Sequence, residues 1–218
     1  MVRKIIHKIN DLTTWLFPER CFGCKKPDEL FCSKCLSDLP PSSVRRAGFI
    51  SVIFSASEYD HPALKSAIRA LKYRSGRKIS DILGAFLARE LNTDMNIILK
   101  EKPLVLAIPM SNNRKRERGY NHAELLAKVV AERLSLSFEP EALKKIKDVA
   151  PQAECRSRRE RFRNIRDSIG VNMSFDFRGK NILLIDDVST TGATLNEATR
   201  VLKKIGAAKI YAAVVARG

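Results

Sequence analysis

The chain has 218 residues, of which 44% are hydrophobic and 29% are charged, and its formal net charge is +16. This composition can bury a core and excludes a disordered chain, and no stretch approaches the roughly 20 apolar residues that a membrane span requires. The positive excess favours a polyanionic partner, with nucleic acid first and an anionic membrane second, although solubility alone is an alternative explanation.

The first segment, residues 1–19, is predicted to be an amphipathic helix. Its apolar residues recur at helical spacing, at Val2, Ile5, Ile6, Ile9, Leu12 and Leu16. Pro18 ends the pattern, and the apolar face predicts that the helix docks on the body of the protein. Because no apolar stretch of signal-peptide length follows the basic start, we expect a cytoplasmic protein.

Residues 20–42 are predicted to form a four-cysteine, zinc-ribbon-like module. It contains two Cys-x2-Cys pairs separated by seven residues, with the cysteines at Cys21, Cys24, Cys32 and Cys35. Two such turns can complete a tetrahedral Zn²⁺ site, and four sulfur ligands leave no position for water or substrate. We therefore expect a structural Zn²⁺ whose binding folds the segment. An iron–sulfur cluster and a redox cysteine pair are the alternatives.

Residues 43–218 alternate between strand and helix patterns, after a proline- and serine-rich stretch at 40–43 that indicates a domain boundary. The predicted strands are 50–54, 104–108, 182–185 and 210–215. The predicted helices are 63–73, 79–91, 123–134 and 195–205. This alternation predicts an α/β domain with a mostly parallel sheet and helices on both faces.

The most informative stretch is 181–195, where a buried strand ends in Asp186 and Asp187 and a loop rich in threonine and glycine follows. Ligands of open α/β sheets bind at the carboxyl ends of the strands. The loop can hold a phosphate at the start of the next helix, and Gly192 permits close backbone approach. The two acids can accept hydrogen bonds from ribose hydroxyls or reach a divalent metal ion. The alternative is an ordinary strand and turn with capping side chains.

Basic residues gather in three segments, 61–80, 111–120 and 156–166. Aromatic residues lie in or beside them, which suits single-stranded nucleic acid, because bases can stack while phosphates pair. No groove-reading motif is present, so binding would be largely independent of sequence. The residues predicted to bind nucleic acid are Lys65, Arg69, Lys72, Arg156, Arg158, Arg159, Arg161 and Arg163. The alternative is that the arginines bind the phosphates of a small ligand or face solvent.

The run from 182 to 194 resembles the signature that binds phosphoribosyl pyrophosphate (PRPP) in type I phosphoribosyltransferases. With the four-cysteine segment, nearly the whole chain resembles the ComF family of competence-associated proteins. Further residues that carry this resemblance are Leu71, Lys72, Tyr73, Ile108, Pro109, Arg114, Arg118, Gly119, Tyr120, Asn121, His122, Pro151, Gln152, Arg161, Asn164, Ala216 and Arg217. The family more often has glutamine at the position of His122.

The resemblance implies the type I phosphoribosyltransferase fold, with Asp186 and Asp187 as the catalytic pair that holds the ribose. The implied PRPP-binding residues are Asp186, Asp187, Ser189, Thr190, Thr191, Gly192, Ala193, Thr194, Ser111, Arg114 and Arg118. It also implies Mg²⁺ bound with PRPP, and a mobile loop around 118–122 that closes over the ligand. His122 invites a general-base role, but a lone histidine at a helix start is more often a polar surface residue.

The sequence is compatible with two functions of different classes. The first is an enzyme that transfers phosphoribose from PRPP to an acceptor, as a nucleobase or nucleotide salvage transferase would. The second is a DNA-handling protein that retains a PRPP pocket. The family resemblance favours the second, because ComF-type proteins are associated with cytoplasmic uptake of transforming single-stranded DNA beside a helicase-like ATPase. We expect PRPP binding together with that role, and leave turnover open.

Overall fold

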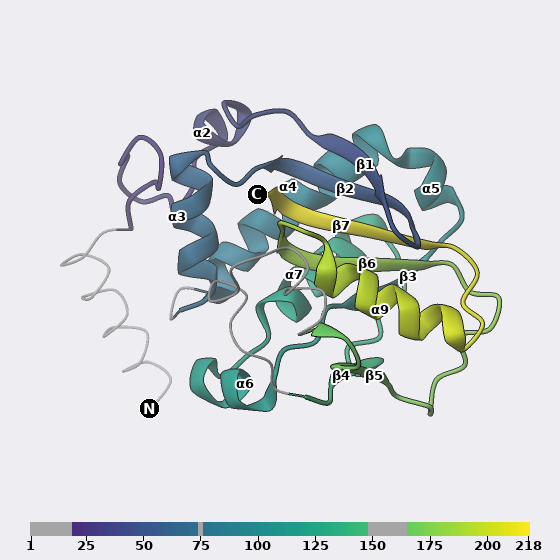
Figure 1. Ribbon diagram of the computed structural model, residues 1–218. Coiled ribbons are helices and arrows are strands. Elements are labelled where there is room, and N and C mark those ends of the chain that lie inside the picture. Colours follow the sequence, from purple (N-terminus) through teal and green to yellow (C-terminus); the bar gives the residue numbers. More distant parts are fainter. Residues whose placement is uncertain (1–18, 74–75, 148–164) are drawn as a thin grey trace, which may run out of the picture.

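The computed structural model describes residues 19–73, 76–147 and 165–218 (Figure 1). Its centre is a five-stranded sheet with the strand order β1-β2-β7-β6-β3. The bounds of these strands are Ser43–Ala47 for β1, Ile50–Glu58 for β2, Leu104–Ala107 for β3, Ile182–Ser189 for β6 and Ile210–Arg217 for β7. The helix predicted over residues 1–19 lies outside the described residues, apart from its last position.

Four of the five strands run parallel, and only the edge strand β1 pairs antiparallel, with β2. Seven consecutive residues of the central strand β7 are buried. An uninterrupted apolar sequence is what a parallel strand needs when helices cover both faces of its sheet. The predicted mostly parallel sheet is therefore confirmed.

Helices cover both faces of this sheet (Figure 1). On one face α4 (Gly76–Asp94) and α7 (His122–Leu134) pack together, and α7 contacts β3 and β6. Gly84 lets these two helices approach closely, since a Cβ there would lie 2.7 Å from the Cβ of Val129. On the other face α9 (Ala193–Lys204) contacts β2.

The remaining elements are short, apart from α3, which packs against α4. Their bounds are Ser33–Ser37 for α2, Pro62–Leu71 for α3, Asn96–Lys100 for α5, Asn112–Arg118 for α6, Leu143–Lys145 for β4 and Ile169–Val171 for β5. Strands β4 and β5 form a separate antiparallel pair. Each strand and helix predicted in 43–218 is found, whereas β1, β4, β5, α5 and α6 were not predicted.

The cysteine-containing segment packs on the body of the protein rather than standing apart from it. Phe31 and Leu39 belong to the same buried core as Ile53 and Leu64. The predicted boundary near residue 42 stays a prediction, because a shared core neither requires nor excludes independent folding. No helix in the described ranges is long and apolar enough to cross a membrane.

Candidate functional site

A cavity of about 570 Å³ lies at the carboxyl ends of β3 and β6. Seven of the residues predicted to bind PRPP line it, and they are Asp186, Asp187, Thr190, Thr194, Ser111, Arg114 and Arg118. They come from two separate stretches of sequence, 111–118 and 186–194. The parallel sheet brings these stretches together because the ends of neighbouring parallel strands meet at one edge.

The acidic pair at the end of β6 is held by backbone hydrogen bonds. Oδ1 of Asp187 accepts from the N–H of Val188 at 2.8 Å, and Oδ1 of Asp186 accepts from the N–H of Asp187 at 2.9 Å. Oδ2 of Asp187 faces two basic side chains, with Lys72 Nζ at 2.9 Å and His122 Nε2 at 3.5 Å. Asp187 therefore meets two basic side chains inside the cavity.

The two carboxyl groups differ in their affinity for a proton. Burial, and then the negative charge of Asp187, raise the pKa of Asp186 well above its usual value. Burial also opposes ionisation of Asp187, but His122 and Lys72 outweigh it and lower the pKa of that group. The ligand-free pocket therefore carries one firmly ionised carboxylate beside one that resists ionisation.

The predicted phosphate-binding loop joins β6 to α9. Gly192 has φ of +73°, a left-handed conformation that glycine adopts without strain, and α9 begins at the next residue. Asn196 Nδ2 donates to the carbonyl of Gly192 at 3.0 Å, which braces the turn. The side chains of Thr190 and Thr194 line the cavity. The loop and helix start therefore form the kind of site that binds a phosphate.

Ser189 does not line the cavity, although it belongs to the predicted loop. Its side chain is buried, and its hydroxyl accepts from Nη2 of Arg45 at 3.0 Å. Thr191 also supports the loop internally, since its Oγ1 accepts from the N–H of Ala193 at 3.3 Å. These two side chains hold the loop in shape, and the surface that a ligand would meet is formed by their neighbours.

The basic stretch 111–120, which overlaps the start of the mobile loop predicted at 118–122, contains a helix, α6. Ser111 is its N-cap, accepting from the N–H of Arg114 at 3.5 Å, and Gly119 ends it with φ of +80°. Arg114 and Arg118 line the cavity from this helix. Guanidinium groups that line a cavity in this way can pair with phosphate oxygens.

Two residues in the cavity correct the sequence interpretation. Lys72 was assigned to nucleic-acid binding with Lys65 and Arg69, but its side chain points into the cavity and pairs with Asp187. His122 was taken as a surface residue, but its side chain is only 12% exposed and also faces Asp187. Both residues are among those that carry the family resemblance, but no local pattern shows their partner, because Asp187 lies more than 60 residues away along the chain.

The other residues predicted to bind nucleic acid are only partly described. Arg69 is exposed on α3, and the ammonium of Lys65 lies 5.4 Å from the ring centroid of Tyr59. The five arginines in this set between 156 and 163 lie outside the described residues. Whether the predicted basic surface exists therefore stays a prediction.

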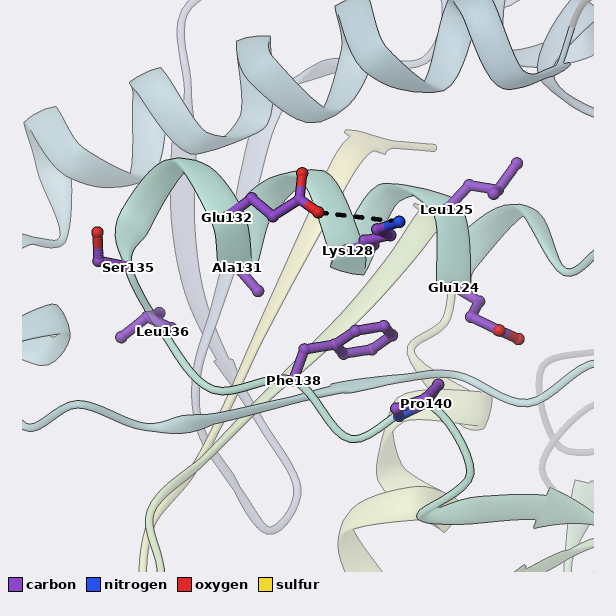
Figure 2. A pocket seen from close by; sticks show the side chains of 9 residues that line it. All are labelled: Glu124, Leu125, Lys128, Ala131, Glu132, Ser135, Leu136, Phe138 and Pro140. Atoms are coloured by element: carbon purple, nitrogen blue, oxygen red, sulfur yellow. Dashed lines mark ion pairs between the residues drawn. The ribbon is translucent and has the colours of Figure 1, made fainter.

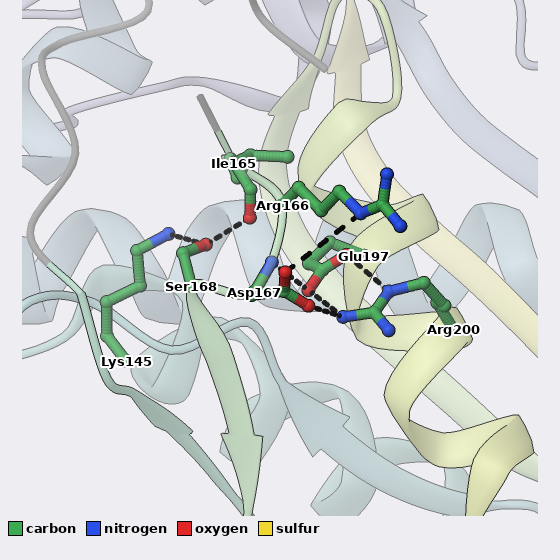
Figure 3. A network of polar contacts seen from close by, with 7 residues as sticks. All are labelled: Lys145, Ile165, Arg166, Asp167, Ser168, Glu197 and Arg200. Carbon is green, nitrogen blue, oxygen red and sulfur yellow. Dashed lines mark hydrogen bonds and ion pairs between the residues drawn. The ribbon is translucent and has the colours of Figure 1, made fainter. Parts of the chain in front are cut away.

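A network of polar contacts, drawn in Figure 3, includes two residues of the cavity lining, Lys145 and Ile165. The N–H of Asp167 donates to Oε1 of the buried Glu197 at 2.8 Å, and Arg200 Nη2 donates to Oδ1 of Asp167 at 2.6 Å. Lys145 Nζ donates to Oγ of Ser168 at 2.9 Å. These contacts tie residues 165–168 to α9 and to β4, and Ile165 and Lys145 line the cavity as a result.

A second cavity, of about 480 Å³, lies along α7 (Figure 2). Leu125, Leu136, Phe138 and Pro140 give it an apolar lining, and the ion pair of Lys128 with Glu132 is part of the same wall. It contains no residue of the predicted motifs. The residues predicted to bind PRPP that line a cavity therefore line the first one.

The four cysteines predicted to bind zinc converge. Their sulfur atoms all lie within 4.8 Å of one another, and Sγ of Cys32 is 3.7 Å from Sγ of Cys21 and of Cys24. A tetrahedral site with Zn–S bonds of about 2.3 Å separates its sulfurs by about 3.8 Å. Burial raises the pKa of Cys21, but N–H groups including that of Cys32 outweigh it and lower the pKa to about 6. The cluster fits a zinc ion.

Comparison with known proteins agrees with this geometry. Residues 121–218 match the family model described as phosphoribosyl transferase domain. The sheet, the acidic pair and the threonine loop therefore belong to a protein with the type I phosphoribosyltransferase fold.

Similarities that extend beyond the phosphoribosyl transferase domain indicate which group of such proteins the chain resembles. Competence protein F of Haemophilus influenzae is 26% identical over 90% of this chain and 90% of that protein. DNA utilization protein YhgH of Escherichia coli is 26% identical over 87% of this chain and 80% of that protein. Competence protein ComFC of Bacillus subtilis is 31% identical over 66% of this chain and 55% of that protein. These relatives, together with the phosphoribosyl transferase domain, support membership of the ComF family of competence-associated proteins.

Solved phosphoribosyltransferases resemble the chain over part of its length. A purine phosphoribosyltransferase from Pyrococcus horikoshii is 21% identical, with a TM-score of 0.37 over 63% of this chain and 71% of that one. A hypoxanthine phosphoribosyltransferase from Staphylococcus aureus is 13% identical, with a TM-score of 0.40 over 62% of each chain. Likeness at this level says nothing of function.

Proposed function

We propose that the protein binds PRPP together with Mg²⁺ in the cavity at the ends of β3 and β6. One observation carries the proposal, which is that the cavity joins three complementary surfaces. Asp186 and Asp187 can accept hydrogen bonds from the ribose hydroxyls. The threonine loop suits the 5′-phosphate, and Arg114 and Arg118 suit the pyrophosphate. PRPP carries these three groups in one molecule.

The metal ion fits the donor set, because carboxylate oxygens are ligands that Mg²⁺ accepts. Bound with PRPP, it would neutralise charge on the pyrophosphate. The protein's own groups orient the sugar through Asp186 and Asp187 and hold the phosphate at the start of α9. Transfer at the anomeric carbon requires little more than such positioning and charge neutralisation. The residues therefore permit turnover, and the acceptor is not identified by them.

Calorimetry tests the binding proposal. Replacing both acids, Asp186→Ala with Asp187→Ala, should weaken PRPP binding at least tenfold, because a hydrogen bond to a charged group contributes about 1.5–3 kcal/mol. Asp176→Asn is the matched control, since Asp176 is an exposed acid paired with Arg178. An unchanged affinity in the double variant, or no heat from PRPP with the wild-type protein, would reject the proposal.

We further propose that the protein acts in cytoplasmic handling of single-stranded DNA during natural transformation. The formal charge of +16 supports a polyanionic partner such as DNA. The names of the relatives, competence protein F and DNA utilization protein, support the same role. A helicase-like competence ATPase is the protein partner that this role implies. The second candidate is a salvage phosphoribosyltransferase without a DNA role, and it is favoured if the protein turns over PRPP with a nucleobase but does not bind DNA.

A further inference from the structure

Lys72 reaches the acidic pair from the end of α3. Its Nζ lies 2.9 Å from Oδ2 of Asp187, and the two side chains are 31% and 8% exposed. Oδ1 of the same carboxylate accepts from the N–H of Val188, so Oδ2 is the oxygen that remains for a partner in the cavity. The ammonium group therefore lies where a cation bound by Asp187 would lie.

The turn that carries Lys72 is held in place. The hydroxyl of Tyr120 donates to the carbonyl of Leu71 at 3.0 Å and also contacts the carbonyl of Tyr73. Gly76 leaves room for this hydroxyl, because a Cβ at that position would overlap it. These contacts hold the backbone on either side of Lys72, and so they fix the point from which its side chain reaches Asp187.

The groups around the same oxygen could hold a divalent ion. His122, Asp186 and Asp187 each offer a ligand atom within 4.8 Å of the other two. Nδ1 of His122 and Oδ2 of Asp187 are buried, and neither has a partner in hydrogen-bond geometry within the described residues. An imidazole with two carboxylates suits Mn²⁺ and related ions. What opposes such an ion is the positive charge of Lys72, a few ångströms away.

We propose that, among the basic residues of the ligand-free pocket, Lys72 is the one that occupies the place of a divalent ion. Its ammonium neutralises Asp187 in place of a divalent ion, so that a divalent ion enters only with an anionic ligand that can draw Lys72 away or offset its charge. The pocket without Lys72 is then a three-ligand site made of His122, Asp186 and Asp187. This inference concerns the ligand-free protein, and it stands whether or not PRPP is the ligand.

The test is a titration with Mn²⁺ in the absence of PRPP. Electron paramagnetic resonance measures the Mn²⁺ that stays free at each step. Mn²⁺ is the probe because it prefers oxygen ligands and leaves the four-cysteine cluster alone. Wild type should bind almost none. Lys72→Met should bind one Mn²⁺ at least about tenfold more tightly than wild type, because a unit positive charge near the ion has been removed. Lys72→Met with Asp187→Asn should lose that ion again.

Two variants test whether the gain of Mn²⁺ binding comes from Lys72 itself or from a general loss of positive charge. Lys72→Arg keeps the positive charge and should behave as wild type. Lys78→Met removes an exposed lysine that pairs with Glu19, and it should also bind no Mn²⁺. If Lys72→Met does not fold, Lys72→Gln replaces it, with the same expectation. Tight Mn²⁺ binding by wild type overturns the proposal, as does the absence of a new site in the folded neutral variants.

Adding PRPP separates this inference from the proposed function. If PRPP raises Mn²⁺ binding by wild type, both are supported. If wild type does not bind PRPP while Lys72→Met gains the Mn²⁺ site, the proposed function fails and the role of Lys72 stands.

Discussion

Arg45 and Ser189 join the edge strand β1 to the loop after β6, with Nη2 of the arginine 3.0 Å from the serine hydroxyl. The contact places a positive charge behind the loop that we assign to the 5′-phosphate. Arg45→Ala should therefore weaken PRPP binding by about 1 kcal/mol, or roughly fivefold, through loss of one charged hydrogen bond to the loop. Calorimetry measures this change. Arg46→Ala, at the exposed next position on β1, is the control and should leave the affinity as in wild type.

Asp186 should limit the stability of the ligand-free protein. Because its pKa is raised on folding, the folded state binds more protons than the unfolded state between the unfolded pKa, about 3.9, and the folded value. Stability attributable to this group is present below that window and is lost as pH rises through it. Asp186→Asn should therefore raise Tm at pH 7 and raise it less at pH 4, while PRPP affinity falls. A Tm that falls at pH 7, or an equal gain at both pH values, would contradict the pKa shift.

The cysteine cluster should hold one zinc ion per chain, and its segment should depend on that ion for folding. Binding of a structural zinc contributes on the order of 10 kcal/mol in small modules. Cys32→Ser should abolish zinc by elemental analysis and expose the segment around Phe31 to proteolysis, while the sheet stays folded. Cys155→Ser changes the fifth cysteine and should keep the zinc. Wild-type protein without zinc would disprove the assignment.

Binding to single-stranded DNA should depend steeply on salt and little on sequence. Each phosphate neutralised on a single strand contributes about −0.7 to the slope of log affinity against log salt. Replacing Arg158, Arg159 and Arg161 with alanine should flatten that slope by roughly two units on every oligonucleotide. The same change at Arg178, Lys203 and Lys204 is the charge-matched control and should alter the slope less. Salt-independent binding, or none at about 50 mM salt, would remove the DNA role.

The triple arginine variant also shows whether DNA and PRPP bind at different sites. If the triple arginine variant keeps DNA binding but loses PRPP, these arginines belong to the small-ligand site, and the predicted basic surface is wrong. Anisotropy with labelled oligonucleotides and calorimetry with PRPP on one preparation give both values.

The core of the fold was predictable because its elements carry local signals. The strand that contains Asp186 and the helix after Gly192 are marked by an apolar run, paired acids and a glycine in a short stretch. Helix α6 was missed because none of its residues is buried, so it has no apolar periodicity. Its ends are still marked by a serine cap at Ser111 and a left-handed Gly119. Strands β4 and β5 have three residues each, too few for an alternating pattern to be recognised.

The candidate site was predictable only where its chemistry is contiguous in sequence. The acids and the threonine loop form one run, whereas Lys72 and His122 reach Asp187 from two other elements. A lysine on a helix with other basic residues has the same local pattern whether it faces solvent or a carboxylate. The direction of its side chain depends on tertiary contacts such as that of Tyr120 with Leu71, which no local pattern records.

A crystal structure of the protein with Mg²⁺ and PRPP tests the central claim most directly. The account predicts the 5′-phosphate at the N–H groups of residues 190–194, the ribose hydroxyls within hydrogen-bond distance of Asp186 and Asp187, and the pyrophosphate toward Arg114 and Arg118. PRPP bound elsewhere, or bound here with its phosphate away from the threonine loop, would contradict the account.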